Sequence, residues 1–209
     1  MRFYELRTSL TDRWSDACTE AFKAPGTKFG DTLQCATCRR TIGMLRWLPP
    51  FRAELEARGS QFGDLAFFGV GDSFLVSQRF RDIYIHHHLT GLEGFEPVEI
   101  VRVKRKKKSL GNPPTYLRAA VCRGKTALDL TASGFEWIAP PSCPDCLNGT
   151  MRSWKRTIVD ESTWTGEDIF IPRGLNAFIV SERFKDVCES NGVTNAVFAS
   201  YVNRLGACQ

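Results

Sequence analysis

The chain has 209 residues, of which 43% are hydrophobic and 24% are charged, and its formal net charge at pH 7 is +5. This length allows one large domain or two small ones, and the composition is that of an ordinary globular protein. No apolar stretch approaches the roughly 20 residues that span a membrane, and residues 1–7 alternate polar and apolar side chains like a strand rather than a signal peptide. We therefore expect a cytoplasmic protein with no membrane segment.

The positive charge is concentrated in one stretch. Residues 102–108 contain six basic side chains, and the other 22 basic residues are matched by 23 acidic ones. Such a run can bind phosphate groups, but it lacks the interleaved aromatic residues that stack on bases. We interpret residues 102–108 first as a solvated linker or hairpin, and nucleic-acid binding through them is the alternative.

The first half of the chain predicts several strands and two helices. We expect strands or buried strand-like segments at residues 3–9, 41–48, 64–68, 74–76 and 95–103. A helix is predicted over residues 78–89, because Ser77 is a good N-cap and apolar side chains recur after it at helical spacing. A shorter helix is predicted over residues 51–58 (FRAELEAR), between Pro50 and Gly59.

A boundary between two halves is predicted after the basic run, where Gly111 and two prolines follow. The halves are residues 1–110, with Cys35 and Cys38, and residues 111–209, with Cys143 and Cys146.

Two ten-residue segments, one in each half, match closely. Residues 74–83 (FLVSQRFRDI) and 178–187 (FIVSERFKDV) are identical at six positions and similar at the other four, at one offset of 104. This match favours a tandem duplication. We predict an internally duplicated α+β fold in which each half has a few antiparallel strands, a Cys-x-x-Cys turn and one main helix. Each copy has too few strands to bury a core alone, so the halves are expected to pack as one pseudo-symmetric body.

The two Cys-x-x-Cys pairs are the strongest chemical motif. Cys35, Cys38, Cys143 and Cys146 together supply the four thiolates of a closed, tetrahedral structural zinc site. A shared site requires the fold to bring the pairs together, and the metal would then join the two halves. Two other interpretations stay open, namely turns that persist without metal and a redox-active dithiol. The other four cysteines are expected to pack as small apolar residues.

Catalytic motifs are absent from the sequence. The three histidines are adjacent at residues 86–88, which excludes a dispersed histidine-based triad. On a helix they would point about 100° apart, so they do not easily share one metal ion. The chain also has no phosphate-binding loop and no zinc-protease motif. We therefore do not expect an enzyme.

The cysteine pairs and three further segments resemble the double-CXXCG motif family of myxobacteria. These segments are residues 137–140 (WIAP), 168–170 (DIF) and 178–184 (FIVSERF). The family motif has glycine directly after the second cysteine, where this chain has Arg39 and Leu147. The resemblance implies a cytoplasmic immunity protein that neutralises a cognate polymorphic toxin delivered between sibling cells, with the toxin gene beside its own. It carries over the positions of the four cysteines and no catalytic residue.

Two functions are therefore weighed. The first is a stoichiometric inhibitor of one protein toxin, and the second is a zinc-containing nucleic-acid-binding module that uses residues 102–108. An inhibitor of a nuclease would present acidic side chains to a basic cleft. The candidates are Glu93, Glu96, Glu99, Asp160, Glu161, Glu167 and Asp168.

Overall fold

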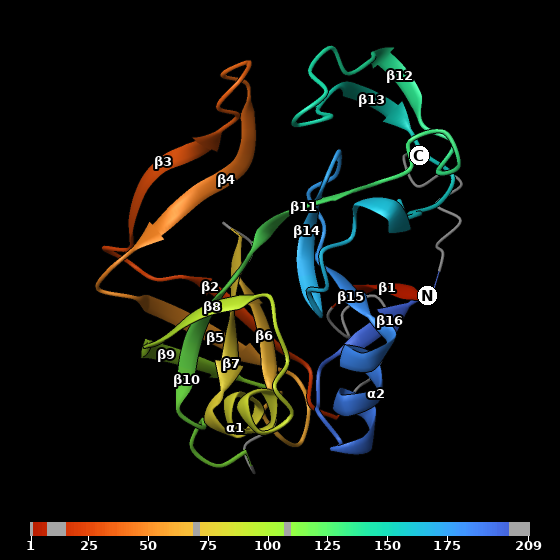
Figure 1. Ribbon diagram of the computed structural model, residues 1–209. Coiled ribbons are helices and arrows are strands. Elements are labelled where there is room, and N and C mark those ends of the chain that lie inside the picture. The colour runs from red at the N-terminus through yellow and green to blue at the C-terminus, as the bar shows by residue number, and fades with distance from the viewer. Residues whose placement is uncertain (1, 8–15, 69–71, 107–109, 201–209) are drawn as a thin grey trace.

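The computed structural model describes residues 2–7, 16–68, 72–106 and 110–200. These residues form sixteen strands, two α-helices and one 3-10 helix, η1 (Glu161–Thr163) (Figure 1). About 46% of the described chain is strand and 11% is helix, so the fold is mostly β. None of the described helices is both long and apolar enough to cross a membrane.

The larger sheet is curled and has seven strands in the order β8-β10-β7-β6-β2-β5-β9. Its strands are β2 (Thr19–Lys23), β5 (Arg52–Ala57), β6 (Leu65–Phe68), β7 (Ser73–Ser77), β8 (Leu92–Pro97), β9 (Glu99–Arg105) and β10 (Tyr116–Val121). β2 runs parallel to β6 and β5 runs parallel to β9, whereas the other neighbours are antiparallel. Every residue of β7 is buried, so this part of the sheet is covered on both faces.

The smaller sheet has five strands in the order β11-β14-β15-β1-β16. Its strands are β1 (Phe3–Arg7), β11 (Arg123–Ala127), β14 (Ile169–Arg173), β15 (Ile179–Ser181) and β16 (Val197–Ala199). The strand nearest the N-terminus, β1, thus lies between two strands from the last third of the chain.

The strand pairing overturns the predicted fold class. β1 comes from the predicted first half but pairs with β15 and β16, and β10 comes from the predicted second half but pairs with β7 and β8. Each sheet therefore includes a strand from the other half, and the two helices are a minor part of the fold. The predicted α+β body of two duplicated halves is wrong, and the protein is mostly β. The domain boundary at residue 110 stays a prediction.

The two α-helices begin in the same way. α1 (Gln78–His86) follows β7, and α2 (Glu182–Ser190) follows β15. The hydroxyls of Ser77 and Ser181 each accept a hydrogen bond from the backbone N–H of the third residue of the helix. Each cap satisfies an N–H that the first helical turn leaves unpaired. The helix predicted after Ser77 is confirmed, although it ends three residues earlier than expected.

The helix predicted over residues 51–58 is wrong, because this segment forms strand β5. Ala53, Leu55 and Ala57 are fully buried, and the residues between them are only partly buried. Burial therefore alternates with the period of two that a strand has. Antiparallel pairing with β2 and parallel pairing with β9 outweigh the helical propensity of this short segment.

One core connects the two sheets and both helices. Phe80 of α1 and Phe184 of α2 are completely buried, with their ring centroids 6.1 Å apart. Leu6 of β1, Val76 of β7 and Ile169 of β14 belong to the same cluster. The sheets therefore share one core, and each sheet also has a separate hydrophobic cluster of its own.

A buried carboxylate ties the start of α1 to the distant segment before β16. Asp64 accepts hydrogen bonds from the hydroxyl of Ser77 at 2.6 Å, from Nη1 of Arg79 at 2.5 Å, and from Thr194 at 3.0 Å. Since the Asp64 side chain is only 8% exposed, these donors replace the water that its charge would otherwise bind.

A second buried carboxylate has matching partners at the start of α2. Asp168 accepts hydrogen bonds from Ser181 at 2.9 Å, from Arg183 at 2.7 Å, and from Thr90 at 3.2 Å. Thr90 follows α1 and Thr194 follows α2, so each carboxylate contacts the segment that follows the other helix. The two helix regions are thus held together by reciprocal polar contacts as well as by the core.

Two hairpins extend from the same side of the molecule. The first consists of β3 (Lys28–Gln34) and β4 (Thr41–Leu48), and the second of β12 (Glu136–Ala139) and β13 (Thr150–Ser153). In Figure 1 they occupy the upper part of the molecule, orange and green-cyan, whereas both helices lie at the lower end. The turn of each hairpin carries one Cys-x-x-Cys pair.

Candidate metal centre

The turns of the two hairpins bring four cysteines together. The Sγ atoms of Cys35, Cys38, Cys143 and Cys146, called the cysteine cluster below, all lie within 4.8 Å of one another. Two of these distances run between the hairpins, at 3.9 Å from Cys35 to Cys143 and at 3.7 Å from Cys38 to Cys146. The convergence of the two pairs that the sequence analysis required is therefore present in the fold.

The spacing and the chemistry of the cysteine cluster fit a tetrahedral metal ion. A zinc ion with four Zn–S bonds of about 2.3 Å separates its sulfur ligands by about 3.8 Å. The two distances between the hairpins agree with this value, and all four thiols are free. Soft thiolate donors select zinc over hard cations such as magnesium or calcium. The four residues can thus hold one metal ion without a large rearrangement.

The backbone of each turn explains why glycine is expected after the second cysteine. Arg39 and Leu147 occupy that position, and their φ angles of 61° and 53° lie in the left-handed region. The N–H of Arg39 donates to the carbonyl of Cys35 at 2.9 Å, and the N–H of Leu147 donates to that of Cys143 at 3.1 Å. This conformation closes each turn around its two sulfur atoms. It costs a residue with a Cβ atom about 1 kcal/mol more than it costs glycine.

The surroundings of the cluster shift the pKa values of two of its thiols in opposite directions. Hydrogen bonds from the backbone N–H groups of Cys38 and Thr37 lower the pKa of Cys35 to about 7. Burial raises the pKa of Cys146 to about 12. Near neutral pH, Cys146 therefore keeps its proton unless a cation displaces it. Cys35 therefore ionises more readily than an ordinary thiol, and full ligation would require metal binding to release protons from the cluster.

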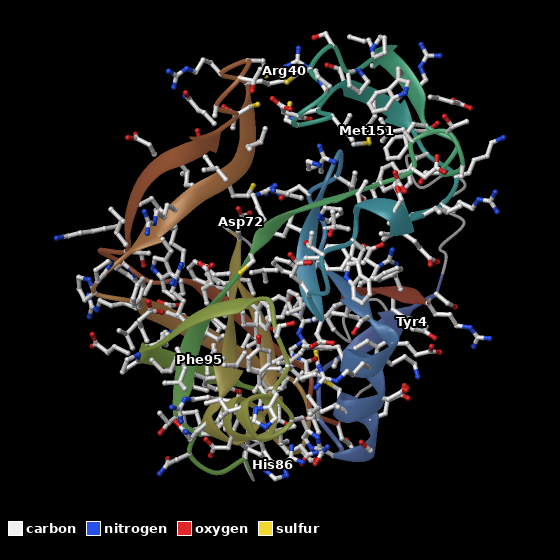
Figure 2. The ribbon with its side chains drawn as sticks, viewed as in Figure 1. Tyr4, Arg40, Asp72, His86, Phe95 and Met151 are labelled. Atoms are coloured by element: carbon white, nitrogen blue, oxygen red, sulfur yellow. The ribbon has the colours of Figure 1, made fainter. Side chains whose placement is uncertain are left out.

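Direct hydrogen bonds join the two turns beside the sulfur atoms. Thr37 donates to the carboxylate of Asp145, and Arg40, labelled near the top of Figure 2, donates to the carbonyl of Asn148. The amide of Asn148 donates in return to the carbonyl of Thr41 at 2.9 Å. The turns therefore form a specific polar contact around the cluster.

The histidines at residues 86–88 are not part of a metal site. They lie at the end of α1, and His87 contacts the amide of Asn191 at 3.2 Å. Across the described ranges, the cysteine cluster is the only group of three or more His, Cys, Asp or Glu side chains close enough to hold an ion.

The basic run lies at an edge of the larger sheet. Its first part belongs to β9, the last strand in the sheet order, where Arg102, Lys104 and Arg105 are exposed. Lys107 and Lys108 lie outside the described residues.

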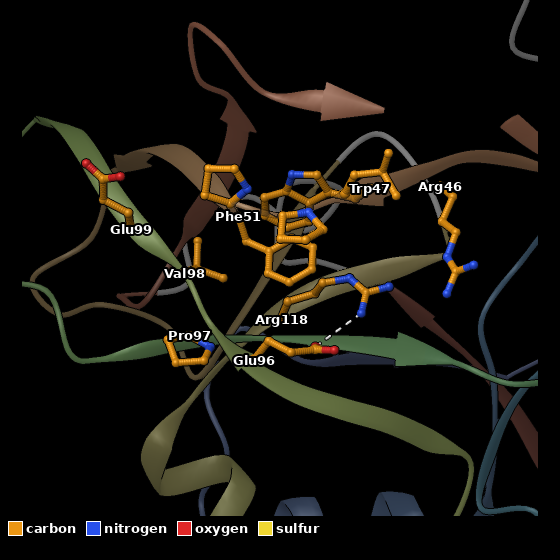
Figure 3. Close-up of a pocket in the computed structure, with 11 residues that line it drawn as sticks. Arg46, Trp47, Phe51, Glu96, Pro97, Val98, Glu99 and Arg118 are labelled. Atoms are coloured by element: carbon orange, nitrogen blue, oxygen red, sulfur yellow. Dashed lines mark hydrogen bonds and ion pairs between the residues drawn. The ribbon is translucent and has the colours of Figure 1, made fainter. Parts of the chain in front are cut away.

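A second candidate site is a cleft between the β3–β4 hairpin and strands β8 and β10. It consists of two adjoining cavities of about 750 and 850 Å³, which share Trp47, Glu96 and Arg118 in their walls. Figure 3 shows the first of these cavities. No sequence pattern points to this cleft, because five separate segments of the chain form its walls.

The acidic side chains expected to face a toxin separate into different environments. Asp168 is buried in its hydrogen-bond network, and Asp160 caps η1. By contrast, Glu93, Glu96 and Glu99 line the cleft. The cleft thus collects three of the seven acidic candidates.

The described residues thus form a mostly β protein in which four clustered cysteines are compatible with a metal site. The comparison with known families identifies the class of protein. The model of the Imm11 immunity protein family matches residues 11–203. The chain therefore belongs to the Imm11 immunity protein family, which confirms the expected immunity class. No curated protein matches the chain significantly.

Proposed function

We propose that this protein is a cytoplasmic immunity protein that binds one cognate protein toxin and blocks its active surface. The observation that carries the proposal is the Imm11 family match, which spans residues 11–203. The function then depends on a stable binding surface rather than on catalysis. Inhibition by binding also requires stoichiometric amounts of the immunity protein.

Co-expression with the toxin tests this proposal. Cells that express the toxin encoded by the neighbouring gene should grow when this protein is present and should die when it is absent. The purified proteins should form a complex of defined stoichiometry in size-exclusion chromatography. If the toxin stays fully active and no complex forms, the proposed function fails.

We also propose that the cysteine cluster binds one structural zinc ion that joins the two hairpins. The sulfur spacing, the four-thiol donor set and the lowered pKa of Cys35 support this assignment. With four protein ligands, the zinc would have no open position for substrate. It would act by fixing the hairpin turns relative to each other.

Metal analysis of protein purified without an affinity-column metal tests the zinc assignment. About one zinc per chain is expected, and Cys143→Ser should lose the metal and lower the melting temperature. Cys18→Ser, which changes a cysteine outside the cluster, is the matched control and should keep the metal. A metal-free protein with full stability would contradict the assignment.

Nucleic-acid binding through residues 102–108 is the alternative, and the exposed basic side chains of β9 are the observation that favours it. Binding of this type should weaken steeply as salt increases. Neutralising Arg102, Lys104 and Arg105 together should abolish it. If the same variant still protects cells from the toxin, nucleic-acid binding and toxin inhibition are separate functions.

A further inference from the structure

The β3–β4 hairpin carries an unusual share of exposed apolar surface. Among the described residues, large hydrophobic side chains are exposed at six positions. Three of these positions are on this hairpin, namely Leu33 at 48%, Met44 at 40% and Leu45 at 42% exposure. Exposed apolar side chains that gather on one element indicate a surface for another protein. Leu33 and Met44 also line the cleft, so the apolar surface continues into it.

The cleft has a rigid aromatic wall. Trp47 stacks on Phe68 with ring centroids 4.2 Å apart and meets Phe51 edge-on at 5.2 Å. The guanidinium of Arg118 lies 5.1 Å from the Phe51 ring centroid and pairs with Glu96 at 3.1 Å, as the dashed line in Figure 3 shows. Trp47 is only 2% exposed, so it supports this wall from behind, and the partly buried Phe51 offers the aromatic surface in the cleft. Because these side chains are already fixed, little conformational entropy is lost when a partner binds.

The charge of the cleft is opposite to that of the whole chain. Five carboxylates and three arginines line the two cavities, which gives a net charge of −2 in a chain of net charge +5. Arg118 and Arg123 are paired with Glu96 and Asp72. Among the described residues, Asp31, Glu93 and Arg46 of the cleft have no ion pair, so the carboxylates without an ion pair outnumber the arginine by one. Glu93 accepts a hydrogen bond from Sγ of Cys122 at 3.2 Å. The unpaired carboxylates favour a partner that supplies positive charge.

We propose that this cleft, together with Leu33 and Met44 of the β3–β4 hairpin, is the docking surface for the cognate toxin. The occupant is a segment of the toxin in which a basic side chain lies beside apolar ones. The apolar side chains cover the hairpin and the aromatic wall, and the basic side chain pairs with Glu93 and Asp31. This inference rests on the proposed immunity function and adds the surface and the chemistry of the partner segment.

Strand β9, at the edge of the larger sheet, is a less suitable surface for a toxin than the cleft. β9 presents Arg102, Lys104 and Arg105, and such charges on an edge strand oppose pairing with another strand. The cleft combines apolar surface, fixed aromatic groups and unpaired charge, whereas β9 offers charge alone.

The test measures binding to a catalytically inactivated form of the toxin encoded by the neighbouring gene, by titration calorimetry. The double variant Leu33→Ala/Met44→Ala should weaken binding about tenfold or more, because it removes two central apolar contacts. Ile85→Ala is the matched control, since Ile85 is equally exposed, at 48%, but lies on α1. Its affinity should equal that of the wild type.

Charge reversal tests the chemistry of the occupant. Glu93→Lys should weaken binding and should reduce its dependence on salt, because it replaces an attractive charge with a repulsive one. Asp186→Lys, which reverses a 67% exposed carboxylate on α2, is the control and should leave affinity unchanged. If Glu93→Lys strengthens binding, the occupant is acidic and the proposed chemistry is wrong.

The outcomes separate this inference from the proposed function. Absence of binding by the wild-type protein would remove the immunity proposal itself. Wild-type binding that none of the cleft variants alters would leave immunity intact and would overturn the docking surface. A self-associated form of the protein in sedimentation experiments, lost in Leu33→Ala/Met44→Ala, would show that a second copy occupies the cleft, which also overturns the inference.

Discussion

At the scale of single residues, the turns of the cysteine cluster hold two side chains in an unfavourable conformation. Arg39 and Leu147 have positive φ angles directly after the second cysteine of each pair. This conformation is unfavourable for arginine and leucine because their Cβ atoms crowd the backbone. The hydrogen bonds that close the turns, together with the contact between the hairpins, keep both residues in place.

Replacing these residues by glycine should therefore stabilise the protein. Arg39→Gly and Leu147→Gly are each expected to raise the free energy of unfolding by about 1 kcal/mol, less the entropy that glycine adds to the unfolded chain. Urea denaturation of the metal-loaded protein measures this change. Ala36→Gly, in the same turn but without a positive φ angle, is the control and should destabilise slightly. If all three variants lose the same free energy of unfolding, Arg39 and Leu147 are not strained.

The sequence identified the cysteines because residue chemistry is local. Four thiols in two short pairs are the donor set of a tetrahedral metal site, and the fold then had to bring the two pairs together. The buried carboxylates Asp64 and Asp168 could not be recognised in this way, because their partners Thr194 and Thr90 lie far away in the chain. A lone aspartate in a sequence gives no sign of such partners.

At the scale of elements, the two hairpins depend on contacts at their turns. Within the described chain, the polar contacts around the cysteine cluster join one turn to the other. β3 is poorly buried, with four of its seven residues exposed. Such strands gain little from hydrophobic burial, so we expect the cluster to contribute much of their order.

Removal of the metal should loosen the hairpins selectively. After chelation, amide hydrogen exchange in β3, β4, β12 and β13 should accelerate by about tenfold or more, while β7 and α1 stay protected by the core. Mass spectrometry of deuterated peptides measures the difference. Uniform acceleration along the chain would instead mean that the cluster supports the whole fold.

The same loosening should follow from acid. Protons compete with zinc for thiolates, and Cys35, whose pKa is about 7, gains its proton as the pH falls through that value. Zinc affinity should therefore decrease from about pH 8 to about pH 6 and decrease more steeply below pH 7. Titration with a competing zinc indicator measures it. An affinity that does not change with pH would exclude thiolate ligation.

Sequence patterns predicted elements well only where local signals agreed. Ser77 and the apolar spacing after it gave helix α1. Residues 51–58 contain good helix formers, but their burial alternates as in a strand. They form strand β5 because they pair with β2 and β9. That pairing is a tertiary effect, which a single segment does not encode.

At the scale of the whole molecule, each of the two sheets contains strands from both halves of the chain. β1 lies between β15 and β16, and β10 lies between β7 and β8. The strand order could not be predicted, because β1 and its partners are separated by most of the chain. The cleft could not be predicted for the same reason, because its walls form only where the β3–β4 hairpin meets β8 and β10.

Separate halves of the chain should therefore fail to fold. A fragment of residues 1–110 lacks β10, and a fragment of residues 111–209 lacks β1, so each leaves a gap inside a sheet. Neither fragment should show a cooperative thermal transition by circular dichroism, and co-expression of both should restore one. Cooperative unfolding of either fragment alone would show that the halves are independent domains.

The position of the cysteine cluster also sets an order of events in folding. Cys35 and Cys143 are 108 residues apart, and closing such a loop in an unfolded chain costs about 4 to 5 kcal/mol. We therefore expect the complete four-sulfur site to form late, once the folded sheets hold the two hairpins in place. A metal ion bound there would then stabilise the folded protein rather than speed its folding. In a growing cell, we therefore expect scarcity of the metal to shorten the lifetime of the folded protein more than it slows folding.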